Sequence, residues 1–177
     1  KGNCNFENGS YRRLAAVGPK LFADSIACGL CIGASTSKGS IVAGVVDLCL
    51  GCDPYDILLD KESFLELGDL SLGAIKVNWK PQPCRAQGSL RYIFIKGSTP
   101  WWFSIGIRNS AAPVKKMELL VDGNWQQVKK EYYNYFTMSL PGPGPYTFRL
   151  TSMFDETLVE EMVPLLNGTS YKGKVQF

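Results

Sequence analysis

The chain has 177 residues, 45% of them hydrophobic and 20% charged, with a formal net charge of +3 and no histidine. This length suits two small domains, and this hydrophobic content supports packed cores, which excludes a disordered chain. The absence of histidine excludes Ser-His and Cys-His nucleophile pairs and histidine-ligated metal sites, so any catalysis would have to use carboxylates. No apolar run approaches the roughly 18 residues of a transmembrane helix, so we expect no membrane span.

The first half of the chain is predicted to contain two strands and two helical pieces. Ser40–Leu48 and Ala74–Trp79 are rich in β-branched residues and bounded by glycine, which is typical of strands. Lys61–Leu67 ends at Gly68 and predicts a short helix. A second helical piece is predicted within Ser10–Phe22.

Short strands follow one another through the second half, separated by turns. Asp122-Gly123 predicts a hairpin, and the prolines and glycines of Pro141–Pro145 form a turn that no helix could cross. The predicted strands are Ser89–Ile95, Trp101–Arg108, Val114–Val121, Trp125–Val128, Tyr133–Ser139, Tyr146–Thr151 and Leu158–Val163. This spacing predicts a β-sandwich.

A change in composition divides the two halves. Residues 1–85 contain all six cysteines but only six of the 21 aromatic residues, and the formal charge of +3 lies wholly in the remainder. Lys80–Cys84, with two prolines, is predicted to be a short, stiff connection. We therefore expect two domains, at residues 1–82 and 86–177. Because no more than two basic residues are consecutive, we expect no nucleic-acid partner.

The cysteines indicate the compartment in which the protein works. All six lie between Cys4 and Cys84, and four of them form two Cys-x-x-Cys pairs, Cys28/Cys31 and Cys49/Cys52. Two such pairs could form a zinc site, but the even total favours disulfides. We therefore expect an oxidising compartment and no bound metal.

Two further features indicate the secretory route. Asn8-Gly9-Ser10 and Asn167-Gly168-Thr169 are acceptor sequences for N-glycosylation. The chain begins at Lys1 without a basic and then apolar leader, so we expect that any signal peptide has been removed. The expected location is extracellular.

Several strings of residues occur in an order that is typical of one family. In the first half they are Gly2-Asn3-Cys4, Ala27–Cys31, Val46–Cys52, Phe64–Gly68 and Val77-Asn78-Trp79. In the second half they are Gly97–Trp102, Ile107-Arg108-Asn109, Tyr133–Phe136 and Val175-Gln176-Phe177. Together they span nearly the whole chain, which resembles the expansins, and among them the microbial and expansin-like branches.

The resemblance implies an all-β protein, with a six-stranded double-psi β-barrel followed by an immunoglobulin-like β-sandwich that binds carbohydrate. It implies the disulfides Cys4–Cys28, Cys31–Cys84 and Cys49–Cys52. It also implies loosening of plant-type cell walls through non-covalent contacts with cellulose and matrix glycans, without hydrolysis. Expansins usually carry a further strand before Gly-Asn-Cys, so we expect that the barrel lacks its first strand or that the sequence is truncated.

Consecutive tryptophans are the most specific candidate for a binding surface. On a regular strand, the side chains of Trp101 and Trp102 would point to opposite faces. The residues alone leave two alternatives open, an exposed aromatic row or a buried Trp102 beside an edge Trp101. The resemblance implies that Trp101, Trp102 and Tyr133 form a row that stacks on sugar rings. Trp79 and Trp125 are predicted to pack.

Acidic residues near the family's groove are the candidates for chemistry. Leu58 stands at the position that matches the family's groove acid, and Asp56 and Asp60 lie two residues to either side. Asp47 matches a second groove aspartate, and its role as a ligand contact or as an acceptor of backbone hydrogen bonds is left open. Because glycosidases need two positioned carboxyl groups, we expect no lytic activity.

Three classes of function follow from these observations. The favoured one is a non-enzymatic, monomeric binder of cellulose and matrix glycans, with a weak attraction to acidic polymers such as pectin. The enzyme alternative is an endoglucanase or lytic transglycosylase that uses Asp47 with Asp56 or Asp60. The third is a signalling or allergen-like protein that has kept the fold and lost the groove. None of the three needs a cofactor.

Overall fold

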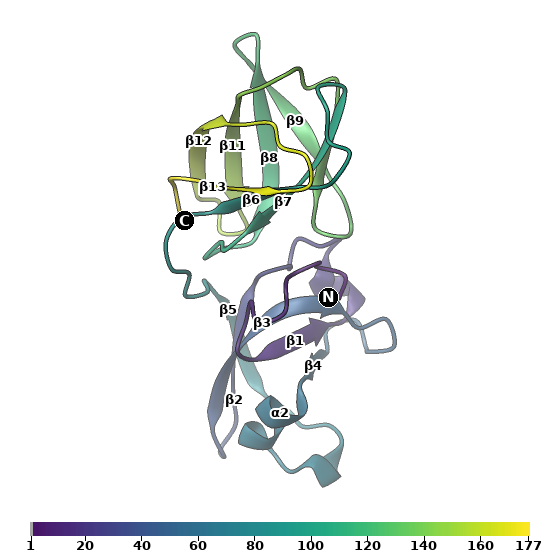
Figure 1. Ribbon diagram of the computed structural model, residues 1–177. Coiled ribbons are helices and arrows are strands. Elements are labelled where there is room, and N and C mark those ends of the chain that lie inside the picture. The colour runs from purple at the N-terminus through teal and green to yellow at the C-terminus, as the bar shows by residue number, and fades with distance from the viewer. Residues whose placement is uncertain (1) are drawn as a thin grey trace. The chain divides into compact units, whose positions relative to one another are not determined.

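The computed structural model describes residues 2–177, and the chain forms two compact units. The first unit ends at Cys84 and the second begins at Arg85. Both units are built of strands (Figure 1), and the chain is all-β. No helix in the described residues is long and apolar enough to cross a membrane.

The first unit is a nearly closed barrel. Its sheet has the strand order β4-β1-β3-β2-β5, with β1 parallel to β3 and the other pairs antiparallel. The bounds are Leu14–Val17 for β1, Cys31–Ser35 for β2, Ser40–Leu48 for β3, Ile57–Leu59 for β4 and Asn78–Gln82 for β5. Five strands make this sheet in the described residues, against the six that the resemblance implies. Alternate residues such as Ala15, Ile32 and Val45 are buried inside it.

Helices are short in this unit. They are α1 (Pro19–Phe22), α2 (Lys61–Leu67) and the 3-10 turn η1 (Leu70–Leu72). Helix α2 is confirmed with the predicted bounds. The second helical piece is wrong for the most part, because Leu14–Val17 forms β1 and only Pro19–Phe22 is helical. Pairing of β1 with strands on both sides outweighs the helix-favouring Leu-Ala-Ala sequence.

The strand predictions for this unit are correct only in part. Ser40–Leu48 is confirmed as β3, whereas residues 74–77 are irregular and the strand runs over Asn78–Gln82 instead. Lys80–Gln82 was predicted to lie in the connection between the two halves. This prediction is wrong, because these residues belong to β5. Pro81 is compatible with a strand here because β5 is an edge strand. β2 and β4 were not predicted.

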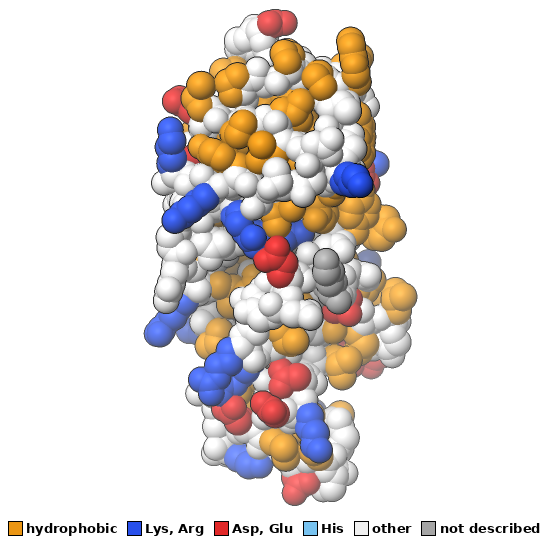
Figure 2. Space-filling model, in the orientation of Figure 1, with side chains coloured by type: hydrophobic (Ala, Val, Ile, Leu, Met, Phe, Trp, Pro, Cys, Tyr) orange, Lys and Arg blue, Asp and Glu red, His pale blue; other side chains and the backbone are white. Residues whose placement is uncertain are grey.

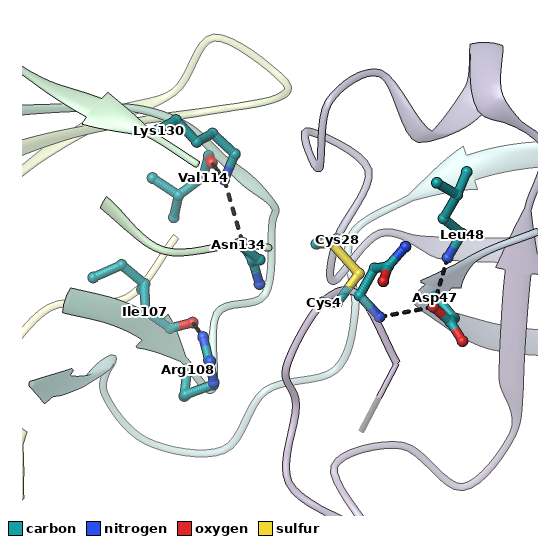
Figure 3. Close-up of a disulfide and its surroundings, with 10 residues drawn as sticks. Cys4, Cys28, Asp47, Leu48, Ile107, Arg108, Val114, Lys130 and Asn134 are labelled. Atoms are coloured by element: carbon teal, nitrogen blue, oxygen red, sulfur yellow. Dashed lines mark hydrogen bonds between the residues drawn. A yellow bond between two sulfur atoms is a disulfide. The ribbon is translucent and has the colours of Figure 1, made fainter. Parts of the chain in front are cut away.

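Three disulfides cross-link the first unit. They are Cys4–Cys28, Cys31–Cys84 and Cys49–Cys52, the pairing that the resemblance implies. The first of these is drawn in Figure 3. The first two are buried, and Cys4 is wholly inaccessible. No cysteine of the described residues is free.

The second unit is a single antiparallel sheet that folds over on itself. Its order is β12-β11-β8-β9-β10-β7-β6-β13. The bounds are β6 Arg91–Phe94, β7 Trp102–Arg108, β8 Val114–Val121, β9 Asn124–Lys130, β10 Phe136–Ser139, β11 Tyr146–Ser152, β12 Thr157–Val163 and β13 Ser170–Lys172. Phe103 of β7 meets Phe148 of β11 edge to face, with ring centres 6.0 Å apart, inside one apolar core.

Most strands of the second unit match their predictions within two residues, and Val114–Val121 matches fully. The exception is Tyr133–Ser139, where the strand begins only at Phe136. Asn134 adopts a left-handed φ of 60° and ends a turn there, in which the N–H of Glu131 donates to the Tyr135 carbonyl. β13 was not predicted.

Candidate functional site

Two adjacent indoles are exposed at the start of β7. The N–H of Thr99 donates to the Trp102 carbonyl (2.8 Å), and the N–H of Trp102 donates back to Thr99 (3.2 Å). This tight turn places Trp101 at its corner, 72% exposed, and leaves Trp102 36% exposed. The next residue, Phe103, points into the core. Neither indole is therefore a core side chain.

The loop that carries the indoles is tied to the end of β10. Ser139 is the register partner of Trp102, and the N–H of Leu140 donates to the Trp101 carbonyl (2.7 Å). Leu140 is itself 72% exposed. Backbone hydrogen bonds therefore hold the loop that carries the exposed side chains of Trp101, Trp102 and Leu140, and we call these three residues the indole patch.

Three tyrosines lie at the other end of β10. The ring of Tyr133 is 5.2 Å from that of Tyr132 and 5.8 Å from that of Tyr135, between centres. Tyr132 is 67% exposed, whereas Tyr133 is half-buried. Tyr132 is thus an exposed aromatic residue that the sequence-based expectations do not include, although the Tyr-Tyr-Asn-Tyr run is a visible signal.

A partly buried lysine lies next to this turn. Lys130 Nζ donates to the Val114 carbonyl (3.0 Å) and to Asn134 Oδ1 (3.2 Å), as Figure 3 shows. Burial, and then the positive charge of Arg108, lower the pKa of Lys130 to about 7. The guanidinium of Arg108 lies 5.0 Å from the ring centre of Tyr135. The turn that carries the three tyrosines is therefore held by the side chains of Lys130 and Arg108.

The first unit contains a groove of about 630 Å³. Its lining includes Leu58, Asp56 and Tyr55 on one side and Trp79 on the other. Trp79 was predicted to pack, but its side chain is 38% exposed, so this prediction is wrong. Trp79 does face the barrel interior opposite Ala34, yet the groove leaves it open to solvent. Trp125 of the second unit is partly buried, 4.5 Å from the guanidinium of Arg149.

The candidate carboxylates have different surroundings. Asp47 Oδ1 accepts hydrogen bonds from the backbone N–H of Asn3 (2.7 Å) and Leu48 (2.9 Å), as in Figure 3. Asp56 is exposed and lines the groove, together with Leu58. The structure thus places Asp56 at the groove and engages Asp47 with backbone donors.

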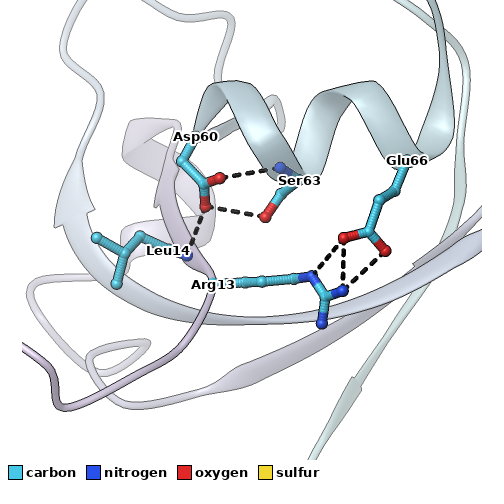
Figure 4. Close-up of polar contacts among 5 residues, drawn as sticks. All are labelled: Arg13, Leu14, Asp60, Ser63 and Glu66. Atoms are coloured by element: carbon cyan, nitrogen blue, oxygen red, sulfur yellow. Dashed lines mark hydrogen bonds and ion pairs between the residues drawn. The ribbon is translucent and has the colours of Figure 1, made fainter.

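Asp60 is a helix cap. Its carboxylate accepts from the N–H and hydroxyl of Ser63 and from the N–H of Leu14, beside the Arg13–Glu66 ion pair (Figure 4). Burial acts to raise the pKa of Asp60, but these hydrogen bonds outweigh it, and the pKa is lowered. A carboxyl group held ionised in this way is a poor proton donor.

Comparisons with known proteins relate the chain to the expansins. No protein-family model matches the chain. Expansin-YoaJ of Bacillus subtilis is 33% identical over 146 residues, which cover 79% of this chain and 62% of that protein. Expansin-like protein 5 of Dictyostelium discoideum is 26% identical over 193 residues, covering 99% of this chain and 79% of that protein. The chain is similar to expansins and expansin-like proteins.

Solved structures agree with this similarity at the level of the fold. The crystal structure of apo Clavibacter michiganensis expansin superimposes on this chain with a TM-score of 0.88 and 23% identity. The match covers 99% of this chain and 88% of that one. A variant of the same protein has been solved in complex with cellohexaose (TM-score 0.87). The chain spans about three-fifths of the length of Expansin-YoaJ.

Proposed function

We propose that the chain binds cell-wall polysaccharide, cellulose or a matrix glycan, without cutting it, and loosens the wall by doing so. The observation that carries this proposal is the indole patch, in which backbone hydrogen bonds hold Trp101 and Trp102 at the surface. Exposed indoles are unfavourable in water unless something stacks on them, and sugar rings offer apolar C–H faces. The Clavibacter expansin complex with cellohexaose gives the ligand class by analogy.

The finer assignments belong to the same proposal. The first domain (1–82) would be a double-psi barrel and the second (86–177) an immunoglobulin-like carbohydrate-binding domain. In the second, Trp101, Trp102 and Tyr133 would form the binding row, and we add Tyr132 because it is the more exposed tyrosine. The chain would act outside the cell as a monomer. Blue and red side chains are interspersed on the face drawn in Figure 2, so binding to pectin would depend on local pairs of charges.

The surroundings of the candidate carboxylates support binding without hydrolysis. Both glycosidase geometries need a protonated acid and a second carboxylate at a set separation. Leu58 cannot donate a proton, and Asp60 is engaged as a helix cap. Asp47 is engaged by two backbone N–H groups. These arrangements leave Asp56 as an exposed carboxylate without a matched partner for an acid–base pair.

Secretion is the remaining part of the proposal. Asn8 and Asn167 are exposed, as a glycosylation acceptor must be. Asn167 Oδ1 accepts from the N–H of Gly97 (2.7 Å), which leaves the amide nitrogen to carry the sugar. Mass spectrometry of the secreted protein after glycosidase treatment tests both sites.

A pull-down tests the binding proposal. Wild-type protein and the Trp101→Ala/Trp102→Ala variant would be incubated with cellulose, xylan, pectin and chitin, and reducing ends would be measured in parallel. Stacking is worth about 1–3 kcal/mol per ring by analogy with base stacking, so the variant should bind at least tenfold more weakly. Leu50→Ala, which removes an exposed apolar side chain of the first unit outside the groove, serves as the control. Reducing-end release by wild-type protein, or retained binding by the double variant, would refute the proposal.

A further inference from the structure

The acceptor sequence Asn167-Gly168-Thr169 lies in the loop between β12 and β13, and this loop is bonded to the hairpin between β6 and β7. The N–H of Gly97 donates to Asn167 Oδ1 (2.7 Å). The N–H of Gly168 donates to the Ile95 carbonyl (3.2 Å). The strand that follows, β13, pairs with β6 (Figure 1). The acceptor asparagine is therefore held against the β6–β7 hairpin.

The same hairpin carries the indole patch. Two residues separate Gly97 from Thr99, a span of at most about 7 Å. Thr99 and Trp102 are bridge partners, which places their Cα atoms about 5 Å apart. The Cα atoms of Gly97 and Trp102 are therefore within about 12 Å of each other. Asn167, which is bonded to Gly97, is thus a neighbour of the indole patch in the second unit.

A glycan on Asn167 would begin in open space beside the hairpin. The sugar is linked to Nδ2, which lies about 2.2 Å from Oδ1 in a planar amide, and Oδ1 remains bonded to Gly97. Asn167, Thr99 and Pro100 are all exposed. A Cβ placed at Gly97 would have no atom of residues 2–177 within 4 Å, apart from its own chain neighbours. The side chains along the hairpin therefore do not separate the glycan from the indoles.

The shape of the polysaccharide decides whether such a glycan interferes with binding. Trp101 is 72% exposed at the corner of its turn, so a polysaccharide stacks on it from the outside. A crystalline face is flat and extends in every direction from the point of contact, so it collides with a bulky group beside the indole patch. A single chain is narrow, and it can cross the indoles without covering residues 96–99.

We propose that a glycan on Asn167 selects the physical form of the polysaccharide that the chain binds. The glycosylated protein binds single chains and is excluded from crystalline faces, whereas protein without this glycan binds both. A clash built against one ligand is an established source of specificity. Because this selection rests on the proposed polysaccharide binding at Trp101 and Trp102, it concerns the regulation of that same site.

Binding to crystalline and to soluble ligand tests the proposal. Asn8→Gln is the common background, so that only Asn167 can be glycosylated, and both proteins are secreted from a glycosylating host. Thr169→Ala is the variant, because it destroys the acceptor sequence and keeps the hydrogen bond between Asn167 and Gly97. The glycosylated protein should bind microcrystalline cellulose about tenfold more weakly than the variant, a steric cost of about 1.4 kcal/mol. Its Kd for cellohexaose should differ by less than about twofold.

Two controls separate the glycan from the substitution. The same two chains, made in a host without N-glycosylation, should bind each ligand equally. Enzymatic trimming of the glycan to its first sugar should restore binding to microcrystalline cellulose.

Four outcomes would overturn the proposal, and they differ in what else they affect. An unmodified Asn167 in the mass spectrum of the secreted protein, or equal binding of both proteins to microcrystalline cellulose, would refute the selection and leave polysaccharide binding intact. An equal loss of cellohexaose binding would mean that the glycan itself stacks on the indoles. If Thr169→Ala binds neither ligand, the proposed polysaccharide binding fails, and the selection fails with it.

Discussion

Asp47 and Leu58 lie on either side of Ala16, on one outward face of the first unit. Ala16 is the register partner of Asp47 on β3 and of Leu58 on β4. Two strand spacings, on the order of 10 Å, therefore separate the two positions. Leu58 is 55% exposed, so a carboxylate at this position would face solvent on the same surface as Asp47.

Leu58→Asp is expected to raise wall loosening without causing hydrolysis. The new carboxylate adds a hydrogen-bond acceptor for sugar hydroxyls, but at an exposed position its pKa stays near the ordinary value of about 3.9, so it is ionised at neutral pH and is a poor acid. Extension of cell-wall strips under load and reducing-end release measure the two effects. Leu58→Asn is the matched control without charge. Oligosaccharide release by Leu58→Asp that disappears with Asp47→Asn would contradict the expectation.

Asp60→Ala is expected to destabilise the first unit by about 1–2 kcal/mol at pH 7, because helix α2 loses its N-cap. The folded-state pKa of Asp60 is lowered from the ordinary 3.8, so its stabilisation is present above that value and is lost as the pH falls through the folded pKa. Urea unfolding at pH 7 and pH 3 should show a smaller difference between variant and wild type at pH 3. Asp69→Ala, which uncaps only the three-residue η1, is the control and should cost less. An equal loss at both pH values would show that the charge of Asp60 contributes nothing.

Lys130→Met is expected to flatten the pH dependence of stability in the second unit. The folded pKa of Lys130 is about 7, against 10.5 for an ordinary lysine, so between these values the unfolded chain binds more protons. Unfolding free energy of the wild-type protein should therefore rise from pH 7 to pH 9. Denaturant titrations at pH 7, 8 and 9 measure the slope, with Lys129→Met, an exposed neighbour, as the control. A slope that Lys130→Met leaves unchanged would mean that Lys130 stays charged in the fold.

Local signals in the sequence were sufficient for some elements and not for others. Lys61–Leu67 could be predicted because Asp60 and Gly68 mark its ends within the sequence itself. Leu14–Val17 could not, because its strand conformation depends on pairing with β3 and β4, which lie far along the chain. Short central strands of this kind carry little propensity of their own.

The same distinction holds for the candidate sites. The exposure of at least one of the two indoles of Trp101 and Trp102 was predictable, because consecutive side chains of a regular strand point to opposite faces. The exposure of Trp79 was not predictable, since it depends on the groove that Trp79 lines together with distant residues such as Leu58. The exposure of Tyr132 depends on the left-handed turn at Asn134, which a tyrosine-rich run does not specify.

Tyr132 and Tyr133 are expected to contribute differently to cellulose binding and to the stability of the second unit. Tyr132 is 67% exposed, so Tyr132→Ala should weaken cellulose binding by about 1–3 kcal/mol while changing stability by less than about 0.5 kcal/mol. Tyr133 is half-buried and packs between the rings of Tyr132 and Tyr135, so Tyr133→Ala should lower stability as well.

Depletion isotherms on cellulose and thermal unfolding of the same samples separate the two roles of these tyrosines. Leu50→Ala removes an exposed apolar side chain of the first unit outside the groove and should leave both cellulose binding and the second unit's stability unchanged. Suppose instead that Tyr133→Ala weakens binding at unchanged stability and Tyr132→Ala has no effect. The binding row would then consist of Trp101, Trp102 and Tyr133 alone, and Tyr132 would lie beside the polysaccharide without contacting it.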